Sequence, residues 1–413
     1  MQGSKVDVVQ IKRKYRGEAA VKRKITLLSA LAISLMASMP LTSSSRAETP
    51  YPIDVVIPLT GGAAFLGKGE EVALRLAEKV VNDAGGIQGH PLQLIYHDDE
   101  SNPQTSVVLT GRILEKKPSV ILGSSLVASC RAMAPLMKNG PVEYCFSPGI
   151  HPEPGYVFSS TISTLDLIDV SIRYLRLKGW KRVAVMVSTD ATGQDAENGI
   201  SEVLARPENK EMKVVATAHF NITDLSVSAQ IENIKAADPQ VLIAWTTGSP
   251  IATILQSLVQ AGLQVPVVST AGNMTYPQMK QYAAFLPEHF LMAAPQWVVT
   301  DPKQLPEGVA AALKVYFDAF AAAGLKPDQG TVLPWDATMF VVLALRKLGV
   351  AATAEQIRDF IAHQRNLPGV EGLYDFVKVP QRGLDVSDSV MTEWSPAAQT
   401  WIALSKVRGV PLP

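Results

Sequence analysis

The 413-residue chain has little of what several common classes of protein require. Its two cysteines are too few for a disulfide-rich scaffold or a cysteine-based zinc site. Its formal net charge is +0, so it lacks the basic excess that is typical of nucleic-acid-binding proteins. We therefore expect no nucleic acid among its partners.

Catalytic motifs are missing as well. The chain contains no G-x-S-x-G, no H-E-x-x-H, no C-x-x-C and no G-x-G-x-x-G. Residues 62–68 spell G-x-x-x-x-G-K, but Gly69 stands where a P-loop needs a hydroxyl to ligate magnesium. The cluster HDDE at residues 97–100 is better interpreted as the charged end of a strand, because metal sites usually gather ligands from separated positions. The sequence predicts no enzyme, no metal site and no cofactor.

No apolar run reaches the roughly 20 residues that a membrane-spanning helix needs. Residues 21–47 instead combine a basic patch, about fifteen apolar residues and a polar tail ending in Ala47, the pattern of a secretory signal. We expect residues 1–47 to be removed on export; a retained anchor is the alternative. Without them the chain would keep 29 of its 38 basic and 36 of its 38 acidic residues, a net charge of −7 that disfavours anionic membranes.

From residue 53 onward, short apolar runs alternate with amphipathic patterns. The pattern predicts strands at 53–59, 92–98, 119–125, 141–147, 182–188, 212–220, 241–245, 265–269 and 289–295, and helices at 71–84, 103–116, 130–138, 165–178, 198–204, 225–236, 251–260, 308–323, 337–348 and 355–363. Such alternation predicts an α/β fold with two doubly wound parallel-sheet lobes. We expect residues 51–160 plus 297–375 to form the N-terminal lobe and residues 161–296 plus 376–408 the C-terminal lobe.

The loops that follow the predicted strands are rich in Ser, Thr and Gly. They cover residues 60–67, 123–129, 147–151, 188–193, 246–250 and 269–273. Such residues are common in ordinary turns and helix caps. Hydroxyls and backbone N–H groups are also neutral donors that can hold a carboxylate. Because ligands bind beyond the carboxyl ends of parallel strands, these loops predict a cleft for a small carboxylated solute.

The segments PLTGGAAFLG, NDAGGIQGHPLQLIYHDDESNP, ILGSS, YCFSPG and RVAVMVSTDATG, behind an export leader, resemble the periplasmic solute-binding proteins of branched-chain amino-acid ABC transporters. The resemblance covers residues 51–406. It implies a type I binding-protein fold with two lobes, three crossovers and hinge closure around a ligand. It also implies a periplasmic monomer that delivers its ligand to an ABC permease in the inner membrane. A ligand-sensing receptor of the same fold is the alternative.

The resemblance assigns the ligand carboxylate to the serine-rich loop at 124–129 and to Gly149, Ile150 and His151. The remaining candidates come from the other strand-end loops. Together the predicted ligand-binding residues are Phe65, Leu66, Ser124, Ser125, Val127, Gly149, Ile150, His151, Thr192, Thr247, Ala271, Asn273 and Trp297.

This chain departs from the family where amino-acid binders place a carboxylate for the ligand ammonium. It has residues 270–273, TAGN, after the strand VPVVS, and none of them is acidic. A buried ammonium without a counter-charge is costly. An acid without an amino group, with aromatic acids included, therefore stands beside a branched-chain amino acid as the expected ligand. Cys130 and Cys145 are compatible with either a disulfide or two buried thiols.

Overall fold

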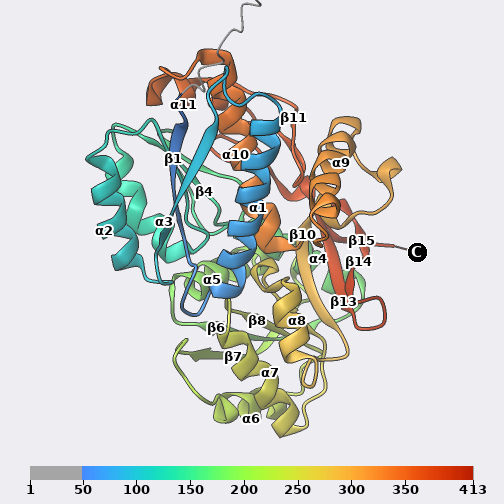
Figure 1. The fold of residues 1–413 in the computed structure, drawn as a ribbon. Coiled ribbons are helices and arrows are strands. Elements are labelled where there is room, and N and C mark those ends of the chain that lie inside the picture. The colour runs from blue at the N-terminus through green and yellow to red at the C-terminus, as the bar shows by residue number, and fades with distance from the viewer. Residues whose placement is uncertain (1–48, 413) are drawn as a thin grey trace, which may run out of the picture. The chain divides into compact units, whose positions relative to one another are not determined.

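The computed structural model describes residues 49–412, which contain two β-sheets flanked by helices (Figure 1). The predicted signal region, residues 1–47, lies outside the described residues. Within the described range, no helix has both the length and the hydrophobicity needed to cross a bilayer.

The first sheet consists of five parallel strands in the order β2-β1-β3-β4-β5. Its strands are β1 (Tyr51–Ile57), β2 (Leu92–Asp98), β3 (Val120–Gly123), β4 (Val142–Cys145) and β5 (Val157–Ser159). Its helices are α1 (Ala64–Asp83), α2 (Pro103–Leu114), α3 (Val127–Met133), α10 (Gln329–Leu348) and α11 (Ala354–Ala362). Helices α2 and α3 cover one face of the sheet, and α1 and α10 pack together on the other (Figure 1).

The second sheet has seven strands in the order β14-β13-β10-β9-β8-β6-β7. Its strands are β6 (Arg182–Ser188), β7 (Lys213–Phe220), β8 (Val241–Trp245), β9 (Val267–Ser269), β10 (Phe290–Pro295), β13 (Ser389–Ser395) and β14 (Thr400–Ala403). The helices of this part of the chain are α4 (Thr164–Leu177), which precedes β6, and α5 (Ala191–Leu204), α6 (Ser228–Ala236), α7 (Pro250–Ala261) and α8 (Tyr276–Tyr282), which connect its strands. Strands β6 to β10 are parallel, whereas β13 and β14 form a hairpin and add to the sheet antiparallel.

The chain passes between the two sheets three times. It leaves the first sheet after β5 and enters α4, which packs against β10 and β13 of the second sheet. It returns after β10 through α9 (Glu307–Ala322) to α10, and it crosses again between β12 (Leu373–Tyr374) and β13. The remaining strands are β11 (Leu367–Pro368), β15 (Ser405–Lys406) and β16 (Val410–Pro411). The predicted fold class, two α/β lobes joined by three crossovers, is confirmed.

Helix α1 starts close to strand β1, earlier than the sequence pattern predicts. Residues 64–70, which the near-match to a P-loop would make a phosphate-binding turn, form its first two turns. A Cβ atom on Gly67 would lie 2.0 Å from the carbonyl oxygen of Pro58, so this glycine permits close helix–strand packing. Gly193 plays the same part in the second lobe, because its Cβ would lie 1.8 Å from the Ser188 carbonyl oxygen.

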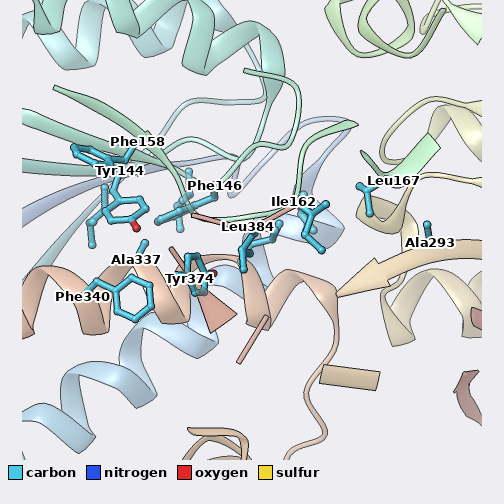
Figure 2. Packing of buried hydrophobic residues seen from close by; sticks show 14 of the residues in the cluster. Tyr144, Phe146, Phe158, Ile162, Leu167, Ala293, Ala337, Phe340, Tyr374 and Leu384 are labelled. Atoms are coloured by element: carbon cyan, nitrogen blue, oxygen red, sulfur yellow. The ribbon is translucent and has the colours of Figure 1, made fainter. Parts of the chain in front are cut away.

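Aromatic rings fill the space between the first sheet and helix α10. Figure 2 shows Tyr144 of β4 and Phe158 of β5 facing Phe340 of α10, with Tyr374 beside them. The ring centroids of Phe340 and Tyr374 are 4.8 Å apart in an edge-to-face arrangement, and those of Tyr144 and Phe158 are 5.7 Å apart. Such pairs add to the burial of apolar surface and fix α10 on the sheet.

Candidate functional site

A small cavity lies where strand-end loops of the two sheets meet. Its lining comes from both sheets and from the crossovers: Leu66, Ser125, Leu126, Val127, Pro148, Thr161, Thr164, Leu167, Thr192, Trp245, Thr247, Thr270, Ala271, Gly272, Pro295, Gln329 and Leu333. Its volume is about 30 Å³. A single water needs roughly 10–15 Å³ on this measure, so the two lobes stand close together around it.

The lining offers neutral polar groups and no charged side chain. Six residues contribute a hydroxyl, namely Ser125, Thr161, Thr164, Thr192, Thr247 and Thr270, and Gln329 contributes an amide. Trp245, a buried residue at the end of β8, also belongs to the lining. The hydroxyls can donate to an anionic group without an opposing buried charge.

Six of the thirteen predicted ligand-binding residues line this cavity. They are Leu66, Ser125, Val127, Thr192, Thr247 and Ala271. Ser125 is 5% exposed, and its Oγ atom has no hydrogen-bond partner of standard geometry within the described residues. A buried hydroxyl without a partner is uncommon in a folded protein, which makes Ser125 the strongest ligand-contact candidate in the lining.

Ser124 and Asn273 serve the framework behind the cavity. The Ser124 hydroxyl donates to the Asp99 carboxylate at 2.8 Å. The Asn273 side chain accepts from the Gly248 N–H at 2.9 Å and donates to the Thr246 carbonyl at 2.8 Å. Asn273 thereby fixes the two second-sheet loops whose ends line the cavity.

The aromatic candidates divide in a similar way. Trp245 lines the cavity, while the ring of Trp297 packs against Trp401 and its indole N–H donates to the Gln329 side chain at 3.0 Å. Trp297 therefore orients a lining residue. Phe65 packs edge-to-face against Tyr282, with ring centroids 6.3 Å apart, outside the lining.

His151 and Gly149 lie at a contact between the two lobes, outside the cavity lining. Asp195 of α5 accepts from Arg131 of α3 at 2.6 Å, and His151 Nε2 is 3.0 Å from the same carboxylate oxygen. Arg131 also donates to the Gly149 carbonyl at 2.7 Å. We call Arg131, His151 and Asp195 the latch. Another interlobe contact joins different loops, from the Ser249 N–H before α7 to the Gly62 carbonyl before α1, at 3.0 Å.

Ile150 is the remaining predicted residue of the loop at 147–151. It is buried next to the disulfide that joins Cys130 and Cys145. The two Cα atoms are 6.1 Å apart, within the usual range for a bonded pair. The disulfide connects the middle of α3 with the end of β4, so it holds together two elements whose adjoining segments contribute to the cavity.

Arg382 organises the crossovers around the cavity. It is buried and donates to Ser159 Oγ at 2.8 Å and to the carbonyls of Pro148, Thr161 and Ile150. Burial lowers the pKa of its guanidinium to about 10, and it remains charged at neutral pH. Since Pro148 and Thr161 line the cavity, Arg382 sets the position of two of its walls. No motif in the sequence marks this arginine.

Side chains of the charged cluster HDDE at residues 97–100 bind other groups of the same chain. His97 contacts Asp54, Asp98 accepts from the Thr60 N–H and hydroxyl, and Asp99 accepts from buried serines. Across residues 49–412, no group of three His, Cys, Asp or Glu side chains is arranged to hold a metal ion.

Several lining residues have no counterpart among the predicted ones. Thr161 and Thr164 belong to the first crossover, and Gln329 and Leu333 belong to the first turns of α10. The sequence pattern starts that helix at residue 337, because Pro334 interrupts it. Asp328 instead caps a helix that runs through the proline.

Comparison with known proteins agrees with the family resemblance seen in the sequence. A family model described as periplasmic binding protein matches residues 50–394. The chain is 24% identical over 338 residues to a leucine-, isoleucine-, valine-, threonine- and alanine-binding protein of Pseudomonas aeruginosa, covering 80% of this chain and 86% of that protein.

Two solved structures illustrate the shared fold. One is the branched-chain amino-acid transporter substrate-binding protein of Streptococcus pneumoniae in complex with isoleucine, with 18% identity, a TM-score of 0.71, and coverage of 86% of this chain and 99% of that one. The other is a fatty acid ABC transporter substrate-binding protein of Thermomonospora curvata, with 16% identity, a TM-score of 0.73, and coverage of 87% and 92%.

Proposed function

Because this chain belongs to the periplasmic binding protein family, we propose that it is the substrate-binding component of an ABC importer and captures a small carboxylated solute. The family resemblance of the sequence is confirmed, and its relatives are solute-binding proteins, not enzymes. The observation that carries the proposal is the cavity between the lobes, lined by six hydroxyls with the Ser125 hydroxyl unpartnered.

Capture requires the lobes to move. A cavity of about 30 Å³ is too small for an amino acid or a comparable acid, so the solute enters when the lobes separate. Closure then brings the hydroxyls of Ser125 and Thr161 from one side and those of Thr192 and Thr247 from the other around its carboxylate, and the lining loops shift to enlarge the cavity to the size of the solute. The latch and the Ser249–Gly62 contact hold the closed arrangement.

The absence of charge from the lining favours an acid without an amino group over an amino acid. An ammonium group enclosed here would meet hydroxyls, a tryptophan ring and aliphatic side chains, with no carboxylate in the lining. The relatives bind both kinds of solute according to their names, branched-chain amino acids in two cases and a fatty acid in the third. A branched-chain amino acid remains the second candidate, supported by the closer sequence match.

The expected setting follows from the family. We place the protein in the periplasm, as a monomer that docks on an inner-membrane ABC permease and releases its solute there. Binding and release of the solute need no cofactor and no covalent step.

A thermal-shift screen with matched ligands tests the proposal. L-Leucine and 4-methylpentanoate share a carbon skeleton and differ in the amino group, and benzoate adds an aromatic acid. A ligand that binds only the folded state raises the melting temperature. Stabilisation by 4-methylpentanoate or benzoate, but not by L-leucine, supports the acid. Stabilisation by L-leucine alone refutes the preference for an acid, and no stabilisation by a broad set of carboxylates refutes the function.

A further inference from the structure

Glu70 is a buried carboxyl directly behind the cavity. It lies on α1 one turn after Leu66, which lines the cavity, and its exposed fraction is 0%. Neither of its carboxyl oxygens has a hydrogen bond of standard geometry within the described residues. Ser125 is nonetheless close enough that its hydroxyl lowers the pKa of this carboxyl, against the larger opposite effect of burial. The cavity's unpartnered serine therefore faces a carboxyl on its inner side.

The other titratable groups around Glu70 are acidic too. Asp99, from the loop after β2, raises the pKa of Glu70 through its charge. Asp328, from the start of α10, approaches the same turn of α1, since its Oδ1 would lie 3.4 Å from a Cβ on Gly69. No lysine or arginine contributes to the pKa of Glu70. Burial with acidic neighbours and no cation favours the neutral form, and the pKa of Glu70 is raised to about 8.

We propose that Glu70 acts as a positioning residue that turns Ser125 into a hydrogen-bond donor for the anionic group of the ligand. The Glu70 O–H donates to Ser125 Oγ, which leaves the Ser125 O–H to donate to a ligand carboxylate oxygen. Ionised Glu70 would accept the serine hydrogen and turn the serine lone pairs towards the ligand anion. Glu70 thus selects anionic ligands through its proton.

This inference rests on the proposed function and adds to it a pH dependence of ligand affinity whose sign depends on the charge of the ligand. An anion in the cavity favours the protonated form of Glu70, so its affinity is constant well below pH 8 and falls above it, by up to tenfold per pH unit. A ligand ammonium would favour the ionised form, and its affinity would rise over the same range.

Infrared spectroscopy tests the protonation without any ligand. The difference spectrum between the wild-type protein and Glu70→Gln isolates the carboxyl of Glu70. We expect the band of a protonated carboxyl at pH 7 and its loss by about pH 9. If the band is already missing at pH 7, Glu70 is ionised and the inference is wrong. Because no ligand is present, this result is independent of the proposed function.

Calorimetry with 4-methylpentanoate tests the consequence. We expect the wild-type protein to bind about tenfold more weakly at pH 9 than at pH 7, and Glu70→Gln, whose amide can donate to Ser125, to lose this dependence. The matched control is Glu143→Gln, because Glu143 is equally buried on β4 but lies outside the cavity lining. The control should keep the wild-type profile. A flat wild-type profile, or one that Glu70→Gln preserves, overturns the inference.

Discussion

Replacing Asp195 by asparagine tests how far ligand affinity depends on the latch. Asp195 is buried on the second lobe and accepts from Arg131 of the first lobe at 2.6 Å, with His151 at 3.0 Å. A hydrogen bond to a charged group contributes about 1.5–3 kcal/mol. Because the Arg131 side chain is 41% exposed, water screens the pair, and we take the lower end, about 1.5 kcal/mol. That loss should weaken binding of 4-methylpentanoate roughly tenfold, since only the closed form holds the ligand.

Calorimetric titration measures the affinity, and small-angle X-ray scattering measures the opening of the ligand-free protein. The matched control is Glu197→Gln on the same helix. It removes the Glu197–His219 pair, 3.0 Å long, which stays within the second lobe. We expect Asp195→Asn to bind more weakly and to have a larger radius of gyration, and the control to change neither. Unchanged affinity in Asp195→Asn, or an equal loss in the control, would refute the role of the latch.

Three further predictions concern the framework of the site. Arg382→Met should lower the free energy of unfolding by about 3–5 kcal/mol in urea titrations, because it leaves the carbonyl groups of Pro148, Ile150 and Thr161 without this donor; a loss below about 1 kcal/mol would contradict the role of Arg382 in positioning the crossovers. Removing the disulfide with Cys130→Ala and Cys145→Ala should cost about 3 kcal/mol, as expected for a separation of 15 residues, and an unchanged melting temperature would contradict this. Gly67→Ala should destabilise by about 1–3 kcal/mol because its Cβ meets a backbone carbonyl, whereas Gly111→Ala in α2, where nothing lies within 4 Å, should stabilise slightly; equal effects would count against the packing argument.

The architecture was accessible from the sequence because local patterns determine it. Every residue of β3 and β8 is buried, and such strands appear in a sequence as continuous apolar runs between turn residues. The predicted end of the first helix at residue 84 lies within one residue of the end of α1, and the glycine pair that follows at 85–86 adopts the positive φ values typical of helix ends.

Element boundaries were less accessible where tertiary contacts override a local signal. The glycines at 62, 67 and 69 suggest a loop, yet helix α1 begins at Ala64 because Gly67 packs on β1. Pro334 suggests a helix start after it, yet a capping box at Asp328 starts α10 earlier. The earlier start of α10 explains why the sequence pattern did not predict Gln329 and Leu333 as lining residues.

The direction of each loop side chain was the least accessible feature. Ser124 and Ser125 are neighbours with the same side chain, but one donates to Asp99 inside the lobe and the other faces the cavity. His151 lies on a loop near the cavity and points to Asp195 of the other lobe. Such choices depend on partners far away in the sequence, so composition and spacing predict the loops of the site better than its individual contacts.

The central claim is that the cavity between the lobes holds a carboxylated solute through Ser125. Its most direct test is a calorimetric titration of the wild-type protein and Ser125→Ala with the carboxylate that gives the largest thermal shift. We predict one binding site per chain, and an affinity at least tenfold lower in Ser125→Ala in a ligand-free protein that still unfolds cooperatively, as for the loss of a hydrogen bond to a charged group. Equal affinities in the two proteins would contradict the account.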